Sequence, residues 1–85
     1  MDRIVNGKKY DTRTADFIES DKEDNSTRWV SLYRKKNGEF FSVHYTLWQG
    51  ESDDLIPLDL EDAKLLAESL LDADGYETIF GKVEE

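Results

Sequence analysis

The only histidine, His44, is the first residue to test as a catalytic group. A hydrolase triad needs an imidazole base beside a nucleophilic hydroxyl. A two-residue turn at Asn37-Gly38 between two strands would place Ser31 directly opposite His44. Hydroxyl and imidazole neighbours across a strand pair are commonplace, however, and the chain has no Gly-x-Ser-x-Gly nucleophile elbow. The sequence therefore favours an ordinary, half-exposed sheet residue at His44 over a catalytic base.

Carboxylates are numerous, so acid–base catalysis and calcium binding are the next chemistries to consider. Acid–base work needs one carboxyl desolvated, with a raised pKa, and these acids stand in polar surroundings. A calcium loop needs Gly at position 6 and Glu at position 12. The series that starts at Asp21 lacks both, and the series that starts at Asp72 has its Gly at position 4. The chain also lacks cysteine and any phosphate-binding glycine loop. We therefore expect no enzyme activity, no metal site and no cofactor.

Length and charge limit the remaining function classes. The 85 residues, 38% of them hydrophobic, predict a single domain over residues 1–85. No apolar run reaches the roughly 20 residues of a membrane span, and the N-terminus lacks a signal segment, so a cytoplasmic protein without membrane contact is expected. The net charge is −9. It is uneven, since residues 1–50 hold 9 Lys and Arg against 8 Asp and Glu, whereas residues 51–85 hold 2 against 12.

Two hairpins and two helices are expected to position these charges, in an α+β fold with an antiparallel sheet. Asn6-Gly7 predicts a tight turn in a short hairpin over residues 3–10. The main hairpin is expected over residues 28–36 and 39–48. Its predicted register pairs Leu32 with Val43 on the core face.

The two helices are expected over residues 12–20 and about 60–72. Asp59 is the predicted N-cap of the second helix, with acidic residues in the first turn. The apolar stripe of this helix should cover the core face of the main hairpin. The stripe consists of Leu60, Ala63, Leu66, Ala67, Leu70 and Leu71.

The outer face of the predicted helix 60–72 combines acids with a leucine. At 100° per residue, Glu61, Leu65, Glu68 and Asp72 fall on one line, away from the core stripe. Acids attract a basic partner and an apolar residue supplies contact area, so this line predicts a partner-binding surface. The predicted surface comprises Asp53, Asp54, Asp59, Glu61, Leu65, Glu68, Asp72 and Asp74. Two alternatives stay open: Leu65 is covered by Ile79, Phe80 or Val83, or the charge serves solubility alone.

A second candidate surface is aromatic. The predicted register puts large rings on the outer face of the main hairpin, more than a solvated sheet face normally carries. These rings are Trp29, Tyr33, Phe40 and Trp48. Either the predicted helix 12–20 covers them or some of them form a binding patch.

Several stretches of the chain resemble small acidic proteins of bacterial mobile elements, mostly from Gram-positive hosts. The resemblance rests on Ile4–Thr12 (IVNGKKYDT), Ser31–Phe41 (SLYRKKNGEFF), Ile56–Leu58 (IPL) and Tyr76–Gly81 (YETIFG). Longer members of that group carry a Gly-rich insertion after the position of Phe41, whereas this sequence continues as a strand through Trp48. By size and charge such proteins are similar to anti-CRISPR and anti-restriction proteins, although no site residue transfers from them.

Charge, pattern and resemblance together predict a non-enzymatic inhibitor or interaction protein. It would bind a basic protein, such as a CRISPR effector or another nucleic-acid-binding protein, through the acidic surface in the manner of a DNA mimic. Direct nucleic-acid binding is not expected, because phosphates would be repelled. The alternative is an accessory or regulatory module that binds another protein through the aromatic hairpin face. An unpaired sheet edge leaves the oligomeric state open.

Overall fold

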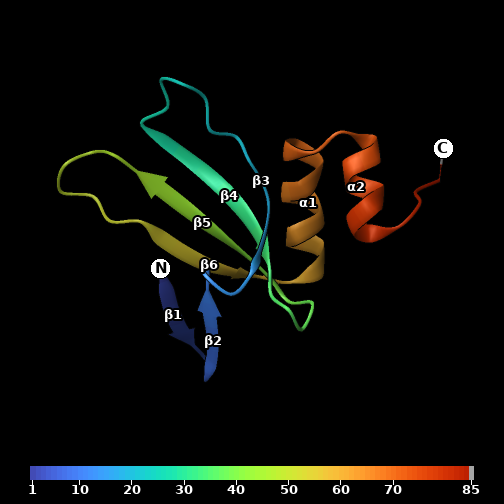
Figure 1. The fold of residues 1–85 in the computed structure, drawn as a ribbon, viewed down its shortest axis with the longest axis horizontal. Helices are drawn as coiled ribbons and strands as arrows, with labels where there is room; N and C mark the ends of the chain where they lie inside the picture. Colours follow the sequence, from blue (N-terminus) through green and yellow to red (C-terminus); the bar gives the residue numbers. More distant parts are fainter. Residues whose placement is uncertain (85) are drawn as a thin grey trace.

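The computed structural model describes residues 1–84 as two antiparallel sheets and two helices (Figure 1). A small sheet pairs β1 with β2, and the larger sheet has the order β3-β4-β5-β6. The elements are β1 (Asp2–Val5), β2 (Lys8–Asp11), β3 (Asp16–Ser20), β4 (Arg28–Arg34), β5 (Phe40–Thr46), β6 (Asp54–Leu58), α1 (Leu60–Leu70) and α2 (Ala73–Phe80). This architecture confirms the predicted α+β class, with hairpins followed by C-terminal helices.

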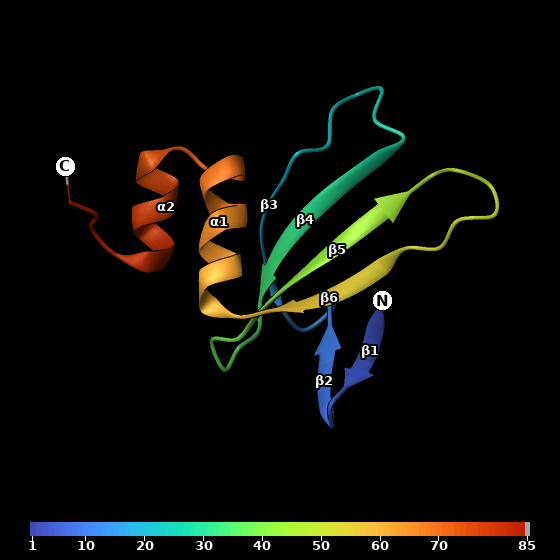
Figure 2. The same ribbon diagram turned by 180° about the vertical axis from the view of Figure 1, so that it is seen from behind.

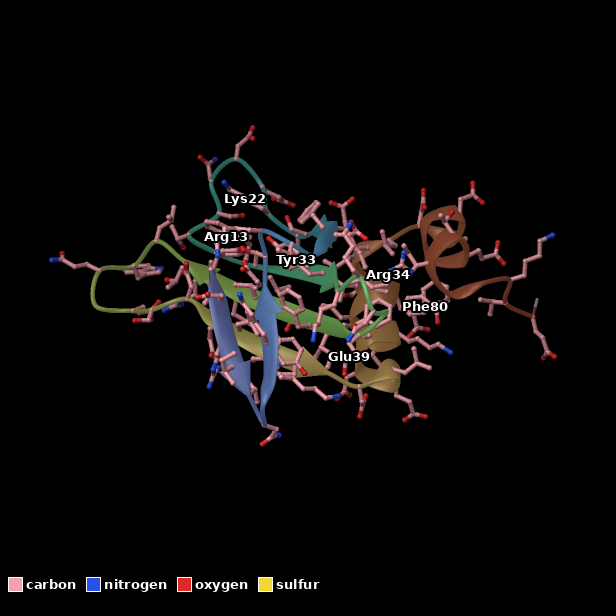
Figure 3. The ribbon with its side chains drawn as sticks, turned by 60° about the horizontal axis from the view of Figure 1, so that its bottom comes forward. Arg13, Lys22, Tyr33, Arg34, Glu39 and Phe80 are labelled. Carbon is pink, nitrogen blue, oxygen red and sulfur yellow. The ribbon has the colours of Figure 1, made fainter. Side chains whose placement is uncertain are left out.

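Each face of the four-stranded sheet is covered over part of its area. The helices pack on Leu32 and Phe40, side by side at one end of the sheet (Figures 1 and 2). The β1–β2 hairpin lies over the opposite face, and Figure 3 labels Tyr33 beside the hairpin. There the ring of Tyr10 meets Phe41 edge-on at 5.6 Å, and Phe41 stacks on Tyr33 at 5.2 Å. Because successive strand residues point to opposite faces, one sheet serves two small cores.

The N-terminal hairpin forms in the predicted register. Asn6 and Gly7 both have positive φ, 51° and 76°, as a type I′ turn requires. Val5 therefore pairs with Lys8, and Arg3 pairs with Tyr10. The Arg3 guanidinium donates to the carbonyl of Leu55 in β6 at 2.7 Å, which ties the hairpin to the edge of the large sheet.

The predicted register of the main hairpin is wrong by one residue. Leu32 pairs with Ser42, and the Lys35 N–H donates to the Glu39 carbonyl at 2.7 Å. The turn between them therefore uses three residues and ends with Gly38 at φ 94°. A shift of one residue moves a strand's side chains to the other face. Val43 consequently lies under the β1–β2 hairpin, opposite the helix-covered face that holds Leu32.

The predicted helix over residues 12–20 is also wrong, because this segment contains strand β3. A tight turn occupies residues 11–15, where the Asp11 carboxylate accepts the Arg13 N–H at 2.9 Å and the Asp11 carbonyl accepts the Ala15 N–H at 3.1 Å. The chain then extends and pairs with β4. Hydrogen bonds from a neighbouring strand thus override a weak local helix pattern.

The segment before the helices forms strand β6, which the sequence did not indicate. It pairs with β5, with Leu55 opposite Val43 and Pro57 opposite Phe41. Proline has no N–H to donate, so it is tolerated in an edge strand such as this one. Leu55 is fully buried and completes the core beneath the N-terminal hairpin.

The C-terminal helices confirm much of the prediction for this region. The Asp59 carboxylate accepts the Asp62 N–H at 2.8 Å, which makes it the N-cap of α1. The helix ends at Leu70, two residues before the predicted end, and the separate helix α2 follows it. Leu60 was predicted in the core stripe but is 55% exposed, since it stands at the first turn of α1. In residues 1–84 no helix is long and apolar enough to cross a membrane.

Candidate interaction surface

The outer face of α1 carries the predicted mixture of acids and a leucine. Glu61, Leu65 and Glu68 follow one another at spacings of four and three residues, so they share one side of the helix. All three are exposed, Leu65 to 64%. We call these three residues, with Asp72 just beyond the helix, the acidic ridge. Leu65 is not covered by the residues that follow α1, as the alternative required.

No cation of the described chain neutralises the acids of the two helices. Six ion pairs occur in residues 1–84, and all of them join residues between Arg3 and Asp54. Residues 59–84 contain eight Asp and Glu residues but only two cations, Lys64 and Lys82. Elsewhere carboxylates are held by cations: Arg28 meets Glu51 at 2.6 Å. The unbalanced charge of the protein is therefore concentrated at its helical end.

A hollow of about 530 Å³ adjoins the C-terminal end of the ridge. The hollow combines apolar side chains with carboxylates on its rim. Its lining includes Glu68, Leu71, Asp72, Tyr76, Glu77 and Val83. The Glu77 carboxylate accepts the Val83 N–H at 2.9 Å, which folds the chain after α2 back over this hollow. Sequence patterns did not indicate this hollow, because the course of the chain there depends on a hydrogen bond between a helix side chain and the backbone after the helix.

Three of the predicted surface acids also bind backbone N–H groups, and a fourth forms an ion pair. Asp59 caps α1, and Asp72 caps α2 by accepting the Gly75 N–H at 2.8 Å. Asp53 accepts the Thr46 N–H at 2.9 Å beside the β5–β6 loop. Asp54 meets Arg3 at 3.0 Å. Asp53 and Asp54 thus belong to the sheet, whereas the helical end has the free charge.

Asp74 belongs to the first turn of α2 and is exposed. The helix N-terminus favours a negative charge there, so this acid also has a local role. Glu61 and Glu68 make no hydrogen bond through their carboxylates within residues 1–84. Those two acids and Leu65 are therefore the residues most readily assigned to a partner.

The predicted aromatic patch does not form, because the observed register places its members on two faces of the sheet. Phe40 is buried against α2, where its ring meets Phe80 at 5.3 Å. Tyr33 is buried on the opposite face and shares a 2.9 Å hydrogen bond with the Tyr45 hydroxyl. Trp29 stacks on Tyr45 at 5.5 Å and is half-buried. Trp48 alone is widely exposed, at 55%.

His44 and Ser31 lie on opposite faces of the sheet. His44 pairs with Val30, and Ser31 pairs with Val43. Ser31 is buried beneath the hairpin, whereas His44 is exposed on the other side. This placement corrects the predicted pairing and removes a hydroxyl–imidazole couple from consideration. In residues 1–84, no three side chains of His, Asp or Glu gather closely enough to hold a metal ion.

Two carboxyl groups in ion pairs have clearly lowered pKa values. Lys8, Asn37 and Lys35 donate to Glu39 and lower the pKa of its carboxyl to about 2. Arg13 donates to Asp11 through its side chain and its backbone N–H, which lowers the pKa of that carboxyl to about 2. Both carboxylates act as fixed anions at ordinary pH. Neither has the raised pKa of a general acid.

Comparison with known proteins gives no relative for this chain. No protein-family model, no curated protein and no solved structure matches it.

Proposed function

We propose that this protein is a non-enzymatic binding protein that docks on a cationic surface of another protein through the acidic ridge. The observation that carries the proposal is the exposed Leu65 between Glu61 and Glu68, whose carboxylates have no cationic partner in the described chain. Unpaired carboxylates attract a basic partner at long range, and a desolvated leucine adds affinity at contact.

A nucleic-acid-handling protein is the partner class that best matches this chemistry. Such proteins carry Lys and Arg arranged to neutralise phosphates. A row of carboxylates offers them negative charge at similar sites, so it competes with nucleic acid. We therefore propose inhibition by occupation of a nucleic-acid-binding surface, of a CRISPR effector or of another protein of this class.

Affinity capture with matched charge reversals tests the proposal. The tagged protein is incubated with bacterial lysate at low salt, and captured proteins are identified by mass spectrometry. Glu61→Lys with Glu68→Lys should lose the partner, because like charges placed in contact cost several kcal/mol. The control is Glu23→Lys with Asp24→Lys, which changes the net charge equally in the exposed β3–β4 loop.

The supporting outcome is a basic nucleic-acid-binding protein that is captured by the wild type and the loop variant but not by the ridge variant. Loss of capture in both variants would show that only net charge matters. Retention in both would place the interface elsewhere. Either of the last two outcomes contradicts docking through the acidic ridge.

A further inference from the structure

A second hollow, opposite in charge to the acidic ridge, lies where the β4–β5 turn approaches the helices. It measures about 530 Å³, and its lining includes four cations, Arg34, Lys35, Lys36 and Lys64. We call it the basic hollow. Arg34 and Phe80 both lie beside this turn in Figure 3. In a chain of net charge −9, four cations around one hollow form a local exception.

Two of these four cations are not neutralised by the described chain. Lys36 meets Asp16 at 2.6 Å and Lys35 meets Glu39 at 3.0 Å, but Arg34 and Lys64 make no ion pair within residues 1–84. Lys36 and, less strongly, Arg34 lower the pKa of Asp16, so that carboxyl remains ionised. Asp16 and Glu39 therefore match two of the four positive charges of the basic hollow, which leaves an excess of about two for an anion.

Lys64 is directed toward the basic hollow although acids are available on its own helix. Glu61 and Glu68 stand three residues before and four residues after it, the spacings at which ion pairs form along a helix. The Lys64 ammonium instead lies 5.9 Å from the centre of the Phe80 ring. A cation over this ring increases the positive charge on the apolar side of the basic hollow.

The remaining lining is apolar and partly accessible. Phe80 and Ile79 of α2 are half-buried, and Leu60 at the start of α1 is 55% exposed. The volume falls in the range of about 300–1,000 Å³ typical of small-molecule sites. Such a site combines an apolar wall with a few convergent charged groups, and the basic hollow has both.

We propose that the basic hollow binds a small phosphate ester whose organic part carries a flat ring, as in a mononucleotide. A phosphate monoester carries about −1.5 to −2 charges at neutral pH, which matches the excess of about two positive charges better than a single carboxylate does. The Arg34 guanidinium presents several donors in a planar fork suited to phosphate oxygens. The ring of the ligand would lie against Phe80, Ile79 and Leu60. This site is independent of docking through the acidic ridge.

Amide NMR of the whole chain tests the proposal with adenosine monophosphate, adenosine and inorganic phosphate as separate probes. We expect saturable shifts with the nucleotide at Gly38, Lys64 and Phe80, and weaker shifts with adenosine or phosphate alone. Arg34→Gln and Lys64→Gln should each lower the affinity for the nucleotide about tenfold, which is the usual contribution of a hydrogen bond to a charged group. Lys22→Gln removes an exposed cation from the β3–β4 loop, outside the basic hollow, and should change nothing.

Three results would overturn the proposal: no saturable shift, equal affinity in all three variants, or shifts that map outside the basic hollow. A short single-stranded oligonucleotide forms a further arm. If it binds while the mononucleotide does not, the hollow contacts a nucleic-acid backbone and the small-ligand assignment is wrong. The two substituted residues lie on different elements, β4 and α1, so one fold defect would not explain both losses. A melting curve for each variant shows whether its fold is intact.

Discussion

The neighbouring leucines Leu65 and Leu66 of α1 should respond very differently to truncation. Full burial of a leucine contributes about 1.5–3 kcal/mol. Leu65 is 64% exposed, so only about a third of that, roughly 0.5–1 kcal/mol, is at stake in Leu65→Ala. Leu66 packs against the core that contains Leu32 and Ala63, so Leu66→Ala should cost about 2 kcal/mol or more.

Thermal unfolding followed by circular dichroism measures both losses, and the two variants differ by only one position on the same helix. In a domain of this size, about 1 kcal/mol corresponds to a melting shift of about 4–8 °C. Leu66→Ala should therefore lower the melting temperature at least twice as much as Leu65→Ala. Equal losses would mean that Leu65 is covered in the folded protein. The reasoning that reserves Leu65 for a partner would then be refuted.

Two further predictions concern the way the N-terminal hairpin is attached. A double-mutant cycle of Tyr10→Leu and Phe41→Leu should give a coupling free energy of about 0.5–1.5 kcal/mol, because the two rings meet edge-on. As a control, substitutions of Tyr10 and Phe40 should be additive within about 0.5 kcal/mol, because these residues lie on opposite faces of the sheet. No coupling between Tyr10 and Phe41 in urea unfolding would contradict the placement of the hairpin. The lowered pKa values of Asp11 and Glu39 mean that their contribution is present above about pH 5 and is lost as the pH falls toward about 2. In urea titrations, the difference in free energy of unfolding between the wild type and the double variant Asp11→Asn with Glu39→Gln should therefore shrink over that pH range. A constant difference would contradict the lowered pKa values.

Local turn chemistry decided which parts of the sheet could be predicted from the sequence. Asn6-Gly7 fits a two-residue turn so well that the N-terminal register followed directly. Asn37-Gly38 carries the same dipeptide, yet the turn there uses three residues. The Asn37 side chain bonds twice to Glu39, at 2.8 and 3.0 Å, and Glu39 is held by Lys8 of the N-terminal hairpin. A contact from 31 residues away cannot be read from a local dipeptide.

The edge strands were missed for a related reason. The segment around Phe17 and the segment around Pro57 have weak local patterns, and each becomes a strand because a central strand supplies its hydrogen bonds. By contrast, α1 combines a cap at Asp59 with a strong apolar period, so it was predictable on its own. For the same reason the position of Leu65 away from the apolar stripe followed from helical geometry. Its exposure and the basic hollow around Arg34 depend on the tertiary fold.

The salt dependence of partner binding tests docking through the acidic ridge most directly. With the captured partner purified, the dissociation constant is measured between about 0.05 M and about 0.3 M salt, a range over which exposed charges become strongly screened. The account predicts steep weakening for the wild type and for Glu23→Gln with Asp24→Gln. It predicts a clearly shallower slope for Glu61→Gln with Glu68→Gln. Binding that is insensitive to salt, or equal slopes in all three proteins, would contradict it.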